Sequence, residues 1–288
     1  MTDLGTSSRL RVGVVGTGRA GAVLGAALTR AGHQVVAACA VSDASRERAA
    51  RLLPGAVLGS PQQAADAADL LLLTVPDDVL PSLVQQLAFP RGQLVAHASG
   101  RHGLSVLEPA SGILPLALHP ALSLHGACDD VARLTGAAFG ITSPEALRPI
   151  AEALVIEMGG EPVWLTERAR PLWHAALAHG ANHLVTLVTS AADLLRQAGA
   201  QDPAAVLGPL LTAALDGALR RGDAALTGPV SRGDAGTVAA HLAVLPDDVR
   251  PAYLALARLT ADRALADGRL APSRAEALLD VLGTAVVR

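Results

Sequence analysis

The sequence RVGVVGTGRAGAVLG, residues 11–25, decides the fold that we predict for this chain. Its apolar beginning, residues 12–15, predicts a buried strand. The apolar periodicity of residues 22–30 predicts that a helix follows. Between the two lies the glycine turn Gly16-Thr17-Gly18-Arg19-Ala20-Gly21. A strand that enters a helix through a turn of this spacing is typical of dinucleotide-binding units.

Each glycine of this turn has a physical role in the predicted site. Gly16 permits the tight turn, Gly18 lets a pyrophosphate approach the backbone, and Gly21 lets the helix pack against the strand. The helix N-terminus adds free N–H groups and a partial positive charge that attract phosphates. A second apolar segment, residues 33–41, supplies the strand expected next. We therefore predict that the turn binds a dinucleotide; a glycine-rich turn that binds nothing is the alternative.

The composition limits the classes of protein and of partner. The 288 residues predict two domains, and the 51% of hydrophobic residues suffice for a core. A net charge of −3, no basic block and 2% aromatic residues argue against nucleic acid and anionic membranes as partners. No apolar segment approaches the length of a membrane span, and Cys39 and Cys128 have no framework spacing. We therefore expect a cytoplasmic protein with reduced thiols.

Strand-like and helical segments alternate up to Leu165, and only helical segments follow. The other expected strands are residues 33–41, 70–75, 93–97, 113–118, 138–142 and 162–165. The expected later helices are residues 168–198, 204–221, 235–245, 249–267 and 273–282. We predict an α/β fold in which residues 1–165 form a dinucleotide-binding domain with a parallel or mostly parallel sheet. Residues 166–288 form an all-α domain for substrate binding and dimerisation.

Ligands of open parallel sheets bind at the carboxyl ends of the strands. There, the segment after the second strand would contact the adenosine ribose. Small hydroxyls and an arginine, Ser42, Ser45 and Arg46, favour NADP(H), whereas Asp43 would suit NAD. A capped helix start, with Ser42 or Asp43 as the N-cap, is the structural alternative. The residues expected along the rest of the cofactor are Val75, Pro76, Asp77 and His97.

Polar residues at other strand ends, and on the first long helix, predict the reaction site. Ser99 and His119 follow two strands and would lie beside the reacting carbon. His174 and Asn182 lie about 80° apart around the helix axis, so both can border one cleft. Any one of these residues could instead be a turn, cap or core residue.

Two further motifs have open interpretations. His179 and His183 have a spacing that could chelate a metal, but no third ligand is evident, and we expect no metal site. The segment Thr227–Asp234 combines a rigid turn, hydroxyls and Arg232, and could bind a carboxylate bidentately. The alternative is a loop between helices with Asp234 as an N-cap.

Five motifs in order resemble a family of predicted NADP-dependent oxidoreductases, in which a Rossmann-like domain precedes a helical domain of unknown function. They are Gly16–Gly21, His97–Gly100, His119-Pro120, Trp173–Ala176 with Asn182, and Thr227–Asp234. The wider group is similar to pyrroline-5-carboxylate reductases, ketopantoate reductases and 6-phosphogluconate dehydrogenases. The resemblance implies a helical dimerisation domain like the C-terminal domain of the 6-phosphogluconate dehydrogenases, and a substrate cleft between the domains.

The absence of lysine is a departure from the better-known relatives. Ketopantoate reductases and 3-hydroxyacid enzymes use a lysine on the first long helix as the acid. His174 occupies a similar place here, and an imidazole titrates near working pH. We therefore expect His174 to donate the proton, Asn182 to bond the reacting oxygen and Arg232 to hold a substrate carboxylate.

The resulting prediction is an NADPH-dependent reductase of a small carboxylate-bearing carbonyl such as a 2-oxo acid, with ketopantoate as the named example. One alternative is an imine reductase resembling pyrroline-5-carboxylate reductase. Another is a sensor that binds NADP(H) without catalysis. The segment 204–221 is apolar around most of its circumference, which predicts a homodimer.

Overall fold

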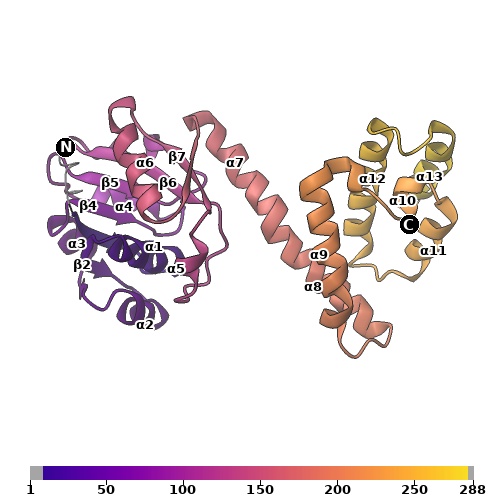
Figure 1. Ribbon diagram of the computed structural model, residues 1–288, viewed down its shortest axis with the longest axis horizontal. Helices are drawn as coiled ribbons and strands as arrows, with labels where there is room; N and C mark the ends of the chain where they lie inside the picture. Colours follow the sequence, from indigo (N-terminus) through magenta and orange to yellow (C-terminus); the bar gives the residue numbers. More distant parts are fainter. Residues whose placement is uncertain (1–8, 285–288) are drawn as a thin grey trace, which may run out of the picture. The chain divides into compact units, whose positions relative to one another are not determined.

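The computed structural model describes residues 9–284, which belong to two compact units (Figure 1). Unit 1 ends at His183 and unit 2 begins at Leu184. None of the helices within residues 9–284 has both the length and the hydropathy that crossing a membrane requires.

Unit 1 contains an eight-stranded sheet in its described residues, with the order β3-β2-β1-β4-β5-β6-β7-β8. The strands are β1 (Arg11–Val15), β2 (Gln34–Cys39), β3 (Val57–Leu58), β4 (Leu70–Leu73), β5 (Leu94–His97), β6 (Leu114–Pro120), β7 (Ala138–Thr142) and β8 (Glu161–Trp164). Neighbouring strands are parallel except β6 and β7, which are antiparallel. This confirms the predicted mostly parallel sheet. The strand order reverses between β1 and β4, where such sheets receive ligands at their carboxyl ends.

Helices cover both faces of the sheet (Figure 1). The helices of unit 1 before β8 are α1 (Arg19–Arg30), α2 (Asp43–Leu52), α3 (Pro61–Asp66), α4 (Leu80–Gln86), α5 (Asp130–Arg133) and α6 (Arg148–Glu157), and α7 (Arg170–Leu177) leads away from the sheet (Figure 1). Side chains of α1 and α6 share a core with Val14 and Leu72, while those of α3 and α4 share another with Leu71 and Val95. Burial on both faces explains why β4 is apolar at every position.

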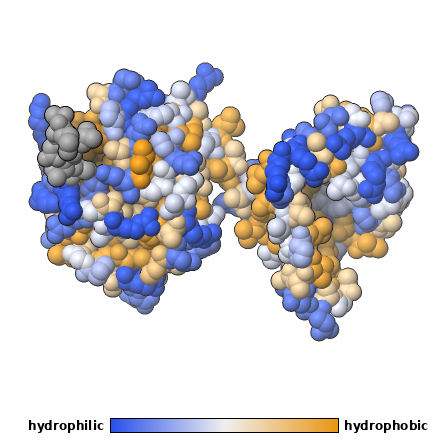
Figure 2. Space-filling model, in the orientation of Figure 1, coloured by the Kyte–Doolittle hydropathy of each residue, from blue (hydrophilic) through white to orange (hydrophobic). Residues whose placement is uncertain are grey.

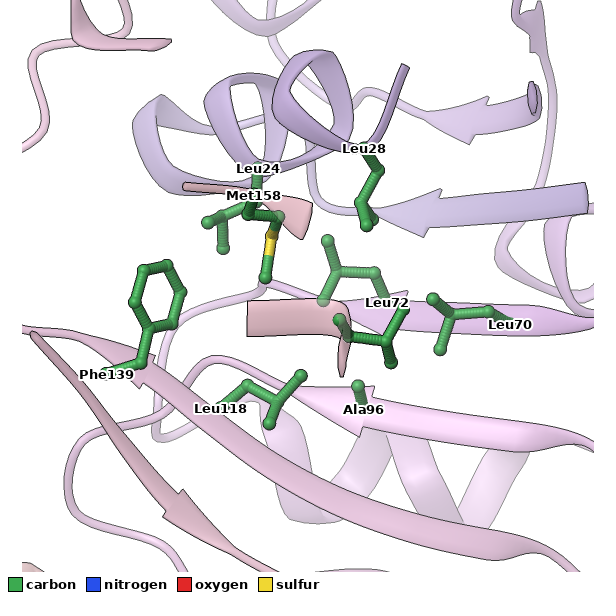
Figure 3. A pocket seen from close by; sticks show the side chains of 9 residues that line it. Leu24, Leu28, Leu70, Leu72, Ala96, Leu118, Phe139 and Met158 are labelled. Atoms are coloured by element: carbon green, nitrogen blue, oxygen red, sulfur yellow. The ribbon is translucent and has the colours of Figure 1, made fainter. Parts of the chain in front are cut away.

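A small void lies in the first of these cores, between α1, α6 and the sheet (Figure 3). Its volume is about 10 Å³, and the nine side chains that line it are all apolar. Leu24 of α1 and Met158, which follows α6, face Leu72 and Phe139 across it. A void of this size holds one water at most and offers it no polar partner, so it is a packing feature and not a ligand site.

Unit 2 is helical throughout its described residues. Its helices are α8 (His183–Gln197), α9 (Pro203–Arg221), α10 (Pro229–Arg232), α11 (Ala235–Val244), α12 (Arg250–Ala266) and α13 (Pro272–Thr284). The last four share a core around Val238, Leu254 and Leu278. In contrast, α8 buries no residue, and α9 exposes Leu210 and Leu219 at 63% and 79%. Figure 2 shows apolar residues at the surface in this region.

One expected helix differs from the structure, and one short strand was not expected. The helix expected over residues 168–198 is not regular, because a 3-10 turn precedes α7 and a π turn, Ala178–Asn182, separates α7 from α8. Periodicity does not mark such a turn, since π segments occur as single-turn bulges within α-helices. The two residues of β3 are too few to show an alternation. The domain boundary at residue 165 stays a prediction; it directly follows β8, and Trp173 of α7 bonds His119 of β6 from beyond it.

Candidate functional site

The glycine turn between β1 and α1 has the geometry that a dinucleotide cradle requires. Gly16 has a φ of +95°, and a Cβ there would lie 2.8 Å from the Thr74 carbonyl oxygen. A Cβ on Gly21 would collide with the Gly16 carbonyl and the Thr74 hydroxyl. A Cβ on Gly18 would meet no atom within 4 Å. Gly18 is the N-cap of α1, so the helix N-terminus faces open space of the kind that a diphosphate fills.

Hydrogen bonds hold this turn in one conformation. The buried Thr17 hydroxyl donates to the Ser45 carbonyl at 3.1 Å. The Thr74 hydroxyl donates to the Gly16 carbonyl at 2.7 Å, and the Gly16 N–H donates to the Cys39 carbonyl at 3.1 Å. The Thr17 side chain therefore supports the turn, while Arg19 and Ala20 begin α1 at its rim.

The residues predicted to contact the ribose phosphate lie at the start of α2. Ser42 is the N-cap, and the Ser42 and Ser45 side chains bond each other's backbone in a capping box. Arg46 pairs with Asp43 at 2.8 Å, and both side chains are exposed. The structural alternative, a capped helix start, is thus present. Of the three predicted ribose contacts, Ser42, Ser45 and Arg46, Arg46 has the most accessible donor group.

The loop after β6 packs against the glycine turn. The buried Asp130 carboxylate accepts N–H bonds from His125, Gly126 and Ala127, and these bonds hold its pKa below the usual range despite burial. Arg51 donates to the Gly126 carbonyl at 2.8 Å, and a Cβ on Gly126 would lie 3.3 Å from the Cα of the turn's Arg19. This wall of the cradle was not predicted from the sequence.

His97 and Ser99, at the carboxyl end of β5, hold the loop that follows. The fully buried His97 ring accepts the Ser99 N–H at Nδ1, 3.2 Å away, and donates from Nε2 to the Gly103 carbonyl, 2.9 Å away. Burial lowers the pKa of His97 to about 4, so the ring is neutral. The Ser99 hydroxyl accepts the His102 N–H at 3.0 Å. Neither ring nitrogen of His97 is left for a ligand.

The segment Val75-Pro76-Asp77 follows β4 beside this loop. The His102 ring donates from Nε2 to the Asp77 carbonyl at 2.9 Å. This bond joins the segment that follows β4 to the loop that follows β5.

His119 and His174, from β6 and α7, meet at the same edge of the sheet. Their ring centroids are 5.7 Å apart in an edge-on arrangement. The Trp173 indole donates from Nε1 to His119 Nδ1 at 3.1 Å. A Cβ on Gly100 would lie 2.7 Å from both His119 Nε2 and His174 Cδ2, so only glycine fits between the two rings. The structure therefore brings His119 and His174 together, next to the loop that carries Ser99.

Arg170, the first residue of α7, is fully buried behind these histidines. Its guanidinium donates to the carbonyls of His102 and Ser99 at 2.6 Å each, and also to the Gly140 carbonyl and the Thr142 hydroxyl. It forms no ion pair with a carboxylate in the described part of the chain. Burial lowers its pKa to about 10, so the guanidinium remains charged. Arg170 is thus a buried cation at the edge of the polar cluster.

The remaining predicted residues lie elsewhere. Asn182 is exposed in the π turn, and His179 and His183 are exposed with their Nδ1 atoms 3.3 Å apart. Within residues 9–284 no three potential metal ligands gather. Arg232 is exposed in α10 of unit 2, and the neighbouring Asp234 caps α11 by accepting the Thr237 N–H.

Sequence reasoning missed Arg170 as a member of this cluster. An arginine at the start of an expected helix is ordinarily exposed, and nothing in the local pattern marks this one as buried. The hydrogen bond between Trp173 and His119 could not be predicted either, because the two residues lie 54 positions apart in sequence.

Comparisons with known proteins agree with this fold. Residues 2–120 match the Rossmann-like domain, and residues 137–260 match a domain of unknown function, DUF2520. No curated protein sequence matches the chain.

Solved structures resemble it over most of its length at low identity. A candidate NADP oxidoreductase of Bacteroides fragilis is 20% identical, with 88% of this chain and 98% of that one covered and a TM-score of 0.76. The 1-pyrroline-5-carboxylate reductase of Streptococcus pyogenes is 15% identical, with 90% and 99% covered and a TM-score of 0.63. The reductive aminase of Aspergillus terreus is 19% identical, with 94% and 99% covered and a TM-score of 0.63. The chain is therefore a Rossmann-like domain followed by a DUF2520 domain, the combination that its five motifs predict.

Proposed function

We propose that this protein is an NADPH-dependent reductase of a small carboxylate-bearing carbonyl compound. The observation that carries the proposal is that a rigid glycine cradle and the His119–His174 pair both lie at the carboxyl ends of one sheet. A nucleotide sensor needs only the cradle. The histidine pair, together with the buried Arg170, favours chemistry beside the nucleotide.

The cradle suits NADP(H). Gly18 leaves room for the diphosphate at the N-terminus of α1, and Arg46 is the donor best available for a ribose phosphate. Val75, Pro76 and Asp77 would flank the nicotinamide half. When bound, NADPH supplies a hydride to the substrate carbon. The relatives that carry NADP in their names are a reason to test this cofactor first.

The reacting groups come from α7 and β6. His174 is half-buried and donates the proton that turns the carbonyl oxygen into a hydroxyl. His119 lies edge-on to it and would contact the same oxygen. The roles of Asn182 and Arg232, as an oxygen contact and a carboxylate contact, stay predictions from the sequence.

Arg170 favours a carbonyl substrate over a protonated imine. Its buried charge has no carboxylate hydrogen-bonded to it in the described residues, and Glu167 and Asp77 offset it only from a distance. At His119 the effect of Arg170 is larger than the opposite effect of Asp77, which indicates a positive potential there. Such a potential stabilises the negative charge that develops on a reduced carbonyl oxygen and opposes an iminium cation. Imine reduction, the reaction type of pyrroline-5-carboxylate reductase among the similar structures, is therefore our second candidate. It ranks second only because a positive potential disfavours an iminium substrate.

Nucleotide titration tests the proposal first. We expect the purified protein to bind NADPH more tightly than NADH, and Arg46→Ala to reduce that preference about tenfold. We then expect 2-oxo acids to oxidise NADPH faster than cyclic imines do, with His174→Ala losing most turnover. Binding of neither nucleotide would refute the proposal, and binding without turnover of either substrate class would favour the sensor.

We further propose that α8 and α9 pack against a second copy of the chain. A helix such as α8, which buries no residue, gains little stability by itself and needs a partner surface. The apolar side chains available for such packing are Val185, Leu187, Val206, Leu210, Leu215 and Leu219. Exposed apolar side chains that gather on neighbouring helices are typical of a protein–protein interface.

A further inference from the structure

The Trp173–His119 hydrogen bond fixes the chemical form of the histidine. An indole N–H can only donate, so His119 Nδ1 must be the acceptor and carries no proton. The neutral ring therefore holds its one proton on Nε2. A doubly protonated ring would set an N–H group against the indole N–H at 3.1 Å, which is repulsive.

The Nε2–H group is available to a ligand. It forms no hydrogen bond within the described part of the chain. It is also not one of the fully buried polar atoms without a partner, so a ligand can reach it. It lies toward Gly100 and the edge of the His174 ring, because a Cβ on Gly100 would meet both. A hydrogen-bond donor at this point lies beside the group proposed to transfer the proton.

We propose that Trp173 is a positioning residue that keeps His119 neutral, so that His119 Nε2–H donates a hydrogen bond to the substrate's carbonyl oxygen while His174 supplies the proton. This inference rests on the proposed reductase function and divides the two histidines into different roles. His119 polarises the carbonyl and transfers no proton. His174 loses a proton to the oxygen and regains it from solvent.

The charges that face His119 act in the same direction. Arg170 and His174, both on α7, oppose a positive charge on the ring, and only Asp77, after β4, favours one. Burial is the largest effect against that charge, and with these smaller charge effects it lowers the pKa of His119 to about 4. The donor therefore stays in one form over the whole range in which an unperturbed imidazole would titrate.

Nitrogen NMR of histidine-labelled protein tests the tautomer without any substrate. We expect His119, assigned by the signals lost in His119→Gln, to show an unprotonated Nδ1 and a protonated Nε2 from about pH 5 to about pH 8. In Trp173→Phe we expect a mixture of tautomers and a ring that takes up a second proton at higher pH. Trp164→Phe, which removes the other tryptophan of the chain, is the control and should leave the signals unchanged.

Kinetics test the role in catalysis. We expect Trp173→Phe to lower kcat roughly 10- to 100-fold with a smaller change in KM, and to add an acidic limb to the pH profile of kcat. A protonated Nδ1 in the unmodified protein, which does not depend on any variant folding, would overturn the inference. So would an unchanged pH profile in a folded Trp173→Phe variant. If the NMR result holds but no carbonyl or imine is reduced, the proposed function fails while the tautomer assignment stands.

Discussion

The two units of the molecule differ in where their buried polar side chains and their exposed apolar side chains lie. Among the described residues, the buried polar and charged side chains lie in unit 1, apart from Ser231. Unit 2 leaves large apolar side chains exposed along α8 and α9, whereas unit 1 exposes them at scattered positions such as Val41, Val57 and Leu172. Buried polar groups are costly and are kept where they are fully bonded or functional, whereas exposed apolar surface marks an interface. This difference agrees with our proposals of a reaction site in unit 1 and of a dimer interface in unit 2.

Removing the buried cation of unit 1 should have the largest effect. Arg170→Met leaves the carbonyls of Ser99, His102 and Gly140 without their donors, so we expect the free energy of unfolding to fall by about 4 kcal/mol. Urea unfolding followed by tryptophan fluorescence measures this loss in unit 1 alone, because both tryptophans, Trp164 and Trp173, belong to it.

The exposed Arg168, two residues earlier, provides the matched control. Arg168→Met should change stability by less than about 0.5 kcal/mol. Equal losses in the two variants would mean that the buried bonds of Arg170 contribute nothing particular to unit 1.

Acid should destabilise unit 1 through His97. Because burial lowers the pKa of the folded state from 6.5 to about 4, the unfolded chain binds the proton more readily. The free energy of unfolding therefore has its full value above pH 6.5 and decreases as the pH falls to about 4. The loss that is due to His97 is at most about 3 kcal/mol. Tryptophan-detected unfolding at a series of pH values measures this slope.

The variant His97→Gln isolates the contribution of this ring. Its stability should depend less on pH between 6.5 and about 4, whatever its stability at neutral pH. The exposed His125 serves as the control, and His125→Gln should keep the full slope. An identical slope in His97→Gln and the unmodified protein would contradict the assignment.

Features made by residues close together in sequence could be predicted, whereas contacts between residues far apart in sequence could not. The glycine turn and the strand ends could be predicted, because each depends on residues that are neighbours in sequence. Trp173–His119 and the four acceptors of Arg170 could not, since those partners come from β6, β7 and the β5 loop. Ser42 and Arg46 were predicted by position, yet the helix cap and the Asp43 pair compete for their side chains.

Charges on α9 should break the dimer interface proposed for unit 2. We expect Leu215→Glu with Leu219→Glu to raise the dissociation constant of a dimer about 100-fold, which is about 2.7 kcal/mol. Sedimentation velocity over a range of concentrations measures the change. Val244→Glu alters an equally exposed apolar residue on α11 and should leave the mass unchanged. A monomer in the unmodified protein would remove the proposed interface.

We expect the smallest effect from Asp234 in the Thr227–Asp234 motif. Its substitution tests whether the motif binds a ligand or stabilises the fold of unit 2. Asp234 accepts the N–H and the hydroxyl of Thr237 at 3.0 and 2.7 Å, and these bonds lower its pKa. We expect Asp234→Ala to make hydrogen exchange at the start of α11 roughly fivefold faster. Asp248→Ala, at an exposed carboxylate outside the motif, should leave that exchange unchanged. Unchanged exchange in Asp234→Ala would mean that the cap is not what stabilises this helix end, and the carboxylate-binding interpretation of the motif would then gain ground over the structural one.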